Sequence, residues 1–294
     1  KGGTVTCPFD FIATPELLLQ HLVMVGQEFN DQTSNVYDVE FDSSSNLQSI
    51  GGAVSGGLPH TVNLAYMPNS AGAADGIKVV GALCSDLSIK GDYGTNSGCI
   101  TMSGNYWSGF SNIQEGNGAG TRSEVDFTGT WVDPDENVFF HMGDLKTKTL
   151  QVEAGSALEM IVKGFEINIS NNVQAIGGDG SGNPEMYTMP QFDITGSLTL
   201  KHDANFDLGT GTNVLSSYVN KNTMGLALKF GDNTVSTVGE MNIAAEIQLT
   251  GDPTVENSDQ GVFWNLPFEC LYDSSTPLEA LKIDIFSDTA PTAM

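Results

Sequence analysis

Hydrophobic and polar residues alternate along several segments of this chain, which is the pattern of β-strands that bury one face. The clearest example is FDITGSLTLKHDANF, residues 192–206, which carries a glycine in mid-strand and ends in a polar run. Its apolar face consists of Phe192, Ile194, Leu198 and Leu200. Its polar face consists of Asp193, Thr195, Ser197 and Thr199. This segment is predicted to be a strand with one packed face and one exposed face.

The same design recurs along the rest of the chain. Residues 165–170 place Glu166 on a polar face, and residues 83–106 place Asp86 on another. The apolar positions predicted to face a core are Leu83, Leu87, Ile89, Ile100, Met102, Tyr106, Phe165, Ile167 and Ile169. Two later segments, 240–249 and 280–286, repeat the pattern with polar faces that carry Glu240, Glu246 and Asp284. With 34 glycines to make turns, the sequence predicts an all-β fold.

Two pairs of strands resemble each other. DLSIKG at Asp86–Gly91 aligns with EINISN at Glu166–Asn171, and MSG at Met102–Gly104 aligns with ITG at Ile194–Gly196. We therefore predict two similar β-hairpins, one in each half of the chain. The matched segments are short, so chance similarity between amphipathic strands is the alternative.

One or two short helices are expected beside the sheets. In TPELLLQHLVMVG, Thr14 suits the N-cap, Pro15 the first turn and Gly26 the end of a helix. A weaker helix is expected within Thr212–Asn222.

Between the first helix and the first hairpin, Asn30–Pro59 is low in hydrophobicity and rich in serine and glycine. It is predicted to be a long loop outside the core. The two halves, 1–150 and 151–294, are expected to form one integrated fold.

The charge balance narrows the function. The chain has 36 acidic and 11 basic side chains, a formal net charge of −25. Binding to nucleic acid through neutralised phosphates is excluded as a function class, because it needs clustered Lys and Arg. The simplest alternative role for the acidity is solubility.

Little in the sequence indicates chemistry. No nucleophile motif surrounds the four histidines, and the glycine-rich segments lack the lysine of a phosphate-binding loop. The Gly/Asp-rich segments 177–185 and 133–137 raise a calcium interpretation, but neither has EF-hand spacing. We predict no catalytic residue, no cofactor and no metal, and therefore a protein that is not an enzyme.

The cysteines and the apolar runs add two further expectations. Cys7, Cys84, Cys99 and Cys270 lie far apart and are expected to be free thiols. Leu17–Val25 is too short to span a bilayer, so no membrane association is predicted.

The order of several segments resembles the major tail tube proteins of long-tailed, siphovirus-like bacteriophages. The likeness rests on GFEINISNNVQAI, QFDITGSLTLKHDANF, MGLALKFGDN, EMNIAAEIQL and LPFECLYDSSTPLEALKIDIFSD, and more loosely on the first half of the chain. The resemblance implies a β-sandwich or half-barrel flanked by a helix, whose sheets join between subunits into an inner β-barrel. It also implies rings of six chains, or of three chains with two modules each, stacked into a virion tail tube assembled in the host bacterial cytoplasm.

Under this resemblance the function is a conduit through which DNA passes without specific binding, and the partners are the tail terminator, tape measure and baseplate or tip proteins. The polar residues predicted to face the lumen are Asp86, Glu166, Asp193, Thr195, Ser197, Thr199, Glu240, Glu246 and Asp284. A competing interpretation is a secreted or cell-surface acidic adhesin or surface-layer module with calcium-binding loops. A carbohydrate-active enzyme would need paired carboxylates near Trp107, Trp131 or Trp264.

Overall fold

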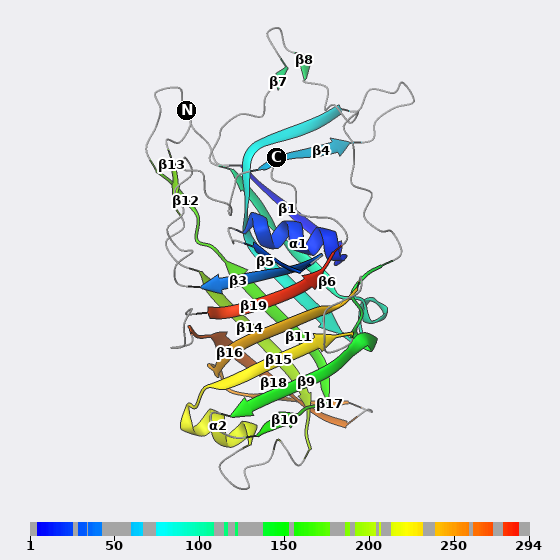
Figure 1. Ribbon diagram of the computed structural model, residues 1–294, viewed down its shortest axis with the longest axis vertical. Coiled ribbons are helices and arrows are strands. Elements are labelled where there is room, and N and C mark those ends of the chain that lie inside the picture. The colour runs from blue at the N-terminus through cyan, green and yellow to red at the C-terminus, as the bar shows by residue number, and fades with distance from the viewer. Residues whose placement is uncertain are drawn as a thin grey trace.

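The computed structural model is built mainly of β-strands, with two short helices (Figure 1). It describes residues 5–25, 29–33, 35–42, 60–66, 75–108, 115–116, 121–122, 138–152, 156–176, 186–188, 192–203, 206, 213–231, 239–258, 261–272 and 279–287. The all-β class and the two short helices predicted from the sequence are thus confirmed.

Most of the strands belong to one open sheet. Its members are β1 (Val5–Ile12), β2 (Phe29–Thr33), β3 (Val36–Asp42), β4 (His60–Tyr66), β5 (Asp75–Asp92), β6 (Thr101–Ser108), β9 (Leu145–Val152), β10 (Ala157–Glu159), β11 (Val162–Ser170), β14 (Asp193–Lys201), β15 (Met224–Phe230), β16 (Met241–Leu249), β17 (Thr254–Ser258), β18 (Gly261–Cys270) and β19 (Glu279–Phe286). Two small hairpins stand apart, β7 (Glu115–Gly116) with β8 (Thr121–Arg122) and β12 (Gln174–Ile176) with β13 (Met186–Thr188).

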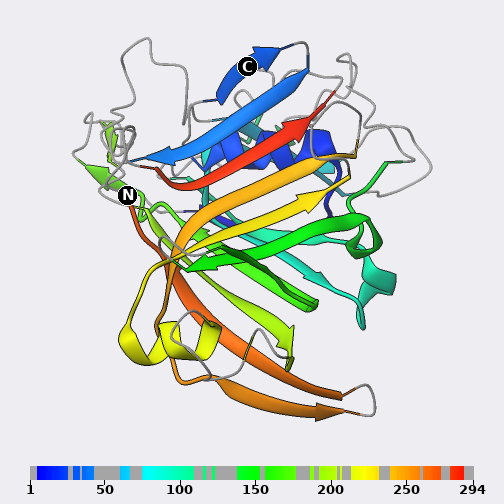
Figure 2. The ribbon, with the colours of Figure 1, turned by 60° about the horizontal axis from the view of Figure 1, so that its bottom comes forward.

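The sheet is bent into two layers, which we call wing 1 and wing 2 (Figure 2). Wing 1 has the order β1-β6-β5-β11-β14-β18-β17, with β4 beside the early part of β5. Wing 2 has the order β10-β9-β15-β16-β19-β3-β2. The wings join where Ile247–Leu249 of β16 pair with Phe268–Cys270 of β18.

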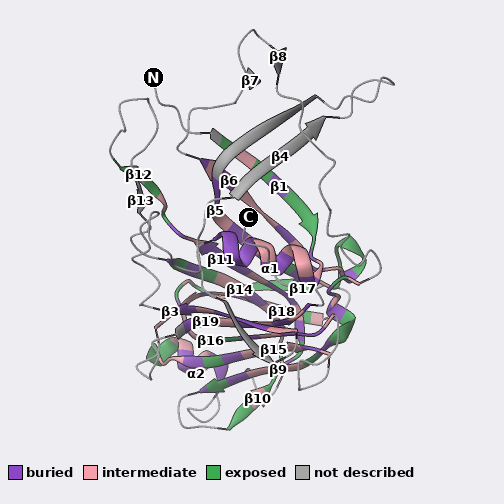
Figure 3. Ribbon diagram, turned by 45° about the horizontal axis from the view of Figure 1, so that its top comes forward, coloured by how far each residue is buried: buried purple, intermediate pink, exposed green. Residues whose placement is uncertain are grey.

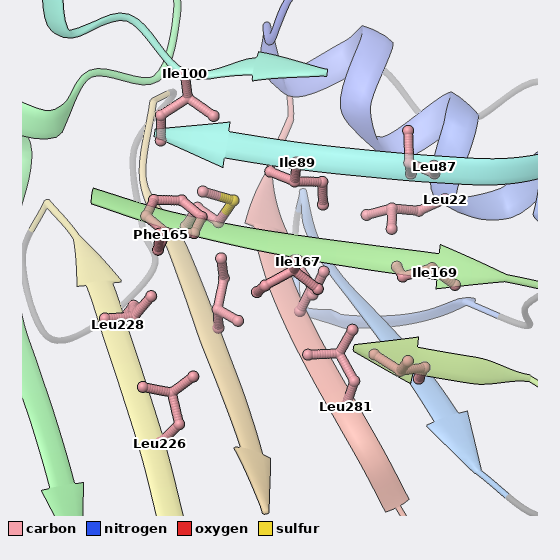
Figure 4. Packing of buried hydrophobic residues seen from close by; sticks show 14 of the residues in the cluster. Leu22, Leu87, Ile89, Ile100, Phe165, Ile167, Ile169, Leu226, Leu228 and Leu281 are labelled. Atoms are coloured by element: carbon pink, nitrogen blue, oxygen red, sulfur yellow. The ribbon is translucent and has the colours of Figure 1, made fainter. Parts of the chain in front are cut away.

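The hydrophobic core lies between the two wings. Phe165, Ile167 and Ile169 of β11 face Leu226 and Leu228 of β15 across it (Figure 4). Every apolar residue that alternation assigned to a core face is buried, and buried and exposed positions alternate along the strands (Figure 3). The period of two read from the sequence therefore gave the correct face for these strands.

Helix α1 (Pro15–Met24) packs against β5, β3 and β19. The side chain of Thr14 caps it by accepting a hydrogen bond from the Leu17 N–H, as predicted. Buried Asn171 ties the end of the helix to wing 1, because its amide donates to the carbonyls of Val25 and Cys84 at 2.8 and 2.7 Å. The helix thus closes the core at the side where β3 and β5 approach.

Helix α2 (Val214–Asn220) lies within the predicted range, with Asn213 as its N-cap and Lys221 in the left-handed conformation at its end. In the part of the chain that the structure describes, no helix combines the length and apolar character needed to cross a bilayer.

The prediction of a long loop at Asn30–Pro59 is wrong for the first part of that segment. Strands β2 (Phe29–Thr33) and β3 (Val36–Asp42) pair with each other, and Tyr37, Val39 and Phe41 are buried in the core. The segment VYDVEFD alternates like the other strands, and β3 gains its place by pairing with β19. Residues 43–59 lie outside the described residues.

The two related hairpins occur in the structure with matching register. In β5–β6, Leu87 stands opposite Gly104, and in β11–β14, Ile167 stands opposite Gly196. These are the positions that the sequence alignment equates. The two hairpins are neighbours, because β5 pairs with β11.

The repeat extends to a third strand on each side. Pro8-Phe9-Asp10 of β1 and Pro267-Phe268-Glu269 of β18 share a proline, a phenylalanine and an acid. Phe9 stands opposite Gly104, and Phe268 stands opposite Gly196. We call β1, β6 and β5 repeat 1, and β18, β14 and β11 repeat 2. The strand order reads the same from either end, so an approximate twofold axis passes between Ser88 and Asn168.

Candidate functional site

The surface with the most distinctive chemistry is the side of wing 1 that faces away from the core, which we call the polar face. It is made by the side chains that alternate with the buried ones on six neighbouring strands. Its residues are Pro8, Asp10, Ile12, Thr101, Ser103, Asn105, Asp86, Ser88, Lys90, Asp92, Glu166, Asn168, Ser170, Asp193, Thr195, Ser197, Thr199, Lys201, Asn265, Pro267 and Glu269.

Strand pairing arranges these side chains in rows across the sheet. The middle row runs from β1 to β18 through Asp10, Ser103, Ser88, Asn168, Thr195 and Glu269. The rows on either side contain Asp86 next to Ser170 and Lys90 next to Glu166. The face is therefore continuous over both repeats, and hydroxyl and amide groups separate most of its charges.

Two carboxylates of the polar face, Asp86 and Asp193, are held by neutral side-chain donors. The Asn105 amide donates to both oxygens of Asp86 at 2.9 and 3.1 Å, and the Ser85 hydroxyl donates to the same carboxylate at 2.8 Å. The Asn172 amide donates to Asp193 at 2.8 Å. Neutral donors fix the position of a carboxylate without cancelling its charge.

Among the polar-face residues there are six carboxylates, Asp10, Asp86, Asp92, Glu166, Asp193 and Glu269, and two cations, Lys90 and Lys201. Lys90 lies 3.6 Å from Glu166, with both side chains open to solvent. An exposed pair of this kind contributes little energy, and carboxylates outnumber lysines by six to two among the residues of this face. The face therefore presents negative potential over most of its area.

Six of the nine residues predicted to face a lumen lie together on this face: Asp86, Glu166, Asp193, Thr195, Ser197 and Thr199. Glu246 and Asp284 lie on the outer face of wing 2. Glu240 is buried just ahead of β16, where its side chain lies against Gly231. The predicted set is thus divided among three places in the molecule.

The outer face of wing 2 has different chemistry, because a lysine lies at the centre of its acids. Lys282 Nζ lies 2.6 Å from Asp38, 2.9 Å from Glu40 and 3.9 Å from Asp284. Burial raises the pKa of Asp38, against the lowering effect of Lys282. Burial alone would lower the pKa of Lys282, but its hydrogen bonds to Asp38 and Glu40 raise it, so the lysine stays charged.

The histidines that the structure describes in detail make structural contacts. His21 is buried with its ring nitrogens 2.6 Å from the Leu17 carbonyl and 2.6 Å from the Tyr106 hydroxyl. His141 accepts from the Gly143 N–H and lies 2.8 Å from the Ser97 carbonyl. Trp264 donates to His202 at 3.0 Å and stacks on Phe206. These contacts engage the imidazoles in the fold.

The thiols and the metal-ligand side chains complete the inventory. The four cysteines are free, as expected, and burial raises the pKa of Cys270 to about 12. Within the described ranges, no three His, Cys, Asp or Glu side chains gather in a way that could hold a metal ion. The two Gly/Asp-rich segments, 177–185 and 133–137, and Trp131 lie outside the described residues.

Sequence reasoning missed Asp92, at the end of β5, and two acids on the outer strands of the two repeats, Asp10 and Glu269. The latter two stand at equivalent positions. The shared tripeptide pattern of β1 and β18 was the available signal. It was overlooked because the two tripeptides lie near opposite ends of the chain.

Comparison with known proteins adds no relative to these observations: no protein-family model and no curated protein matches this chain.

Proposed function

We propose that this chain is the subunit of a bacteriophage tail tube, in which rings of copies stack around a channel and the polar face of wing 1 lines the bore. The observation that carries the proposal is the composition of that face: a continuous six-stranded surface of hydroxyls, amides and six carboxylates with two lysines.

The physical reason lies in how DNA interacts with charged walls. Each phosphate that a Lys or Arg neutralises releases counterions and adds affinity, so a basic wall would hold the DNA. A wall of carboxylates repels the phosphates, and hydroxyl and amide groups keep it wetted. DNA would therefore slide through such a bore without being retained.

The architecture is compatible with this role. Wing 1 would form part of the inner wall and wing 2 would lie outside it, as in a half-barrel whose sheet continues into the next subunit. Joining sheets between subunits also removes exposed strand edges. The Lys282 cluster, with Glu246 and Asp284, would then face away from the DNA.

The assembly expected from the resemblance is a ring of six chains, or of three chains if each contributes two equivalent modules. The rings would stack into the tube of a virion tail, with terminator, tape measure and baseplate or tip proteins as further partners. The approximate twofold axis of wing 1 relates two hairpins within one layer, so it does not by itself choose between three and six.

The test is the state of the purified protein. Negative-stain microscopy over a range of protein concentrations is expected to show rings with a central hole and short stacks of them. Monomers at every concentration would contradict the proposal. Monomers whose melting temperature rises on addition of calcium would instead favour the adhesin interpretation.

A further inference from the structure

The two repeats of wing 1 differ at their outer edges. In repeat 2, β16 pairs with Phe268–Cys270 of β18. The Thr250 N–H donates to the Pro267 carbonyl at 3.1 Å, and the Leu271 N–H donates to the Glu246 carbonyl at 2.8 Å. In repeat 1, the equivalent stretch of β1 is Phe9–Ile12, and β1 pairs only with β6 among the strands that the structure describes.

Backbone direction shows which groups this edge offers. The Ala13 N–H donates to the Ile100 carbonyl beside β6. Because backbone N–H groups alternate in direction along a strand, those of odd-numbered residues of β1 point toward β6. The N–H groups of Asp10 and Ile12 therefore point away from β6, toward the edge of the sheet. Pro8, which has no N–H, occupies an outward position, where proline is tolerated. The outward groups of Asp10 and Ile12 correspond to those of Glu269 and Leu271, which face β16.

Side-chain exposure differs in the same way. Phe11 and Ile12 are 41% and 51% exposed, whereas their counterparts Cys270 and Leu271 are half-buried. Large apolar side chains beside unpaired backbone groups make an edge that readily accepts another strand.

The opposite end of wing 1 has a second edge of this kind. Beyond β17 the described residues contain no further strand of the wing, and Val255 and Val262 of the β17–β18 hairpin are 47% and 40% exposed. The charges at this hairpin are mixed: Glu256 of β17 pairs with Lys163, which also contacts the ring of Phe263, and Lys201 lies beside Gly261. The described part of β1 carries Asp10 and no basic residue.

We propose that the β1 edge at Asp10–Ile12 pairs with the β17 edge of a second copy of this chain. The two edges belong to the same wing, and both expose apolar side chains. A head-to-tail contact of this type repeats from copy to copy, and it forms a ring when the rotation between copies closes. The inference deepens the proposed function by naming the seam between subunits, but the seam itself does not depend on DNA.

The test compares two proline substitutions at equivalent positions of the repeats. Asp10→Pro removes an N–H that points away from β6 and pairs with no other described strand, so the variant is expected to melt near the wild-type temperature. It is also expected to need about tenfold more protein to assemble, because one edge hydrogen bond is lost and proline blocks the edge. Glu269→Pro, opposite Gln248 of β16, is expected to lower the melting temperature of the monomer itself.

A second variant keeps the test independent of proline effects. Ile12→Lys places a charge at a half-exposed side chain on the edge, and it is expected to weaken assembly in the same direction as Asp10→Pro. Sedimentation velocity measures assembly, and thermal unfolding measures the fold of each variant.

The outcomes separate the two proposals. Rings in the wild type that persist unchanged in both β1 variants would overturn the seam and leave the tube proposal standing. Oligomers that are not ring-shaped but disappear in both variants would support the seam and contradict the tube. A wild-type chain that stays monomeric would overturn both.

Discussion

Gly196→Ala is expected to lower the free energy of unfolding by about 3 kcal/mol, because the mid-strand glycine of β14 has no room for a side chain. A Cβ at this position would overlap the backbone carbonyl oxygen of Glu166 and the ring of Phe268. The carbonyl belongs to the neighbouring strand and the ring lies in the core, so relief requires the sheet to shift. Urea denaturation of the purified variant measures the loss.

Two further glycines make this prediction specific. Gly104→Ala in repeat 1 is expected to behave like Gly196→Ala, since its Cβ would overlap the Asp86 carbonyl and lie 2.9 Å from the ring of Phe9. Gly225→Ala in β15 is the control, because the nearest atom to its Cβ would be 3.7 Å away. Equal stabilities for the Gly196 and Gly225 variants would refute the explanation for the glycine in the repeated hairpins.

Lys282→Met is expected to cost about 3 kcal/mol of stability near pH 8, because it leaves the Asp38 carboxylate buried without its cation. Asp38 is 2% exposed at its side chain, and Lys282 is its ion-pair partner at 2.6 Å. This loss of stability is at the lower end of the values typical for breaking a buried ion pair, because the Lys282 side chain is itself about a third exposed.

The loss should also depend on pH in a defined direction. Burial already raises the pKa of Asp38 above its ordinary value of 3.8, and loss of Lys282 would raise it further. A carboxyl group whose folded pKa is raised binds its proton more tightly in the folded state, so the cost applies above that pKa and fades as the pH falls toward 3.8.

Urea denaturation at pH 8 and at pH 5 tests this dependence, with a deficit expected to be smaller at pH 5. Lys229→Met on the same outer face is the matched control, because no ion pair of Lys229 is found in the described part of the chain. A deficit of equal size at both pH values would show that Lys282 contributes packing rather than charge compensation.

Alternation along the chain identified the buried and polar sides of the individual strands. Ile167 and Glu166, for example, lie on the sides that the sequence predicted. Alternation reports only the two sides of one strand, however. Glu246 has the correct polar position on β16, but β16 crosses from β18 into wing 2, so the side chain lies on another surface from Glu166. Long-range pairing decides this, and no local pattern contains it.

Two other differences have local causes. The strand β3 was overlooked because its neighbours in sequence are rich in serine and glycine, although Tyr37, Val39 and Phe41 alternate within it. Glu240 precedes the first residue of β16, where the side chain folds over Gly231 instead of following the alternation of the strand. Strand ends are where a period of two ceases to predict direction.

The central claim is that the polar face of wing 1 lines a channel. A cryo-electron microscopy map of the assembled protein measures this directly, through the radial positions of Glu166 and Asp193 relative to Lys282. The account predicts a tube with Glu166 and Asp193 at the bore and Lys282 at larger radius. A tube whose bore is lined by the Lys282 cluster, with Glu166 and Asp193 on the outside, would contradict it.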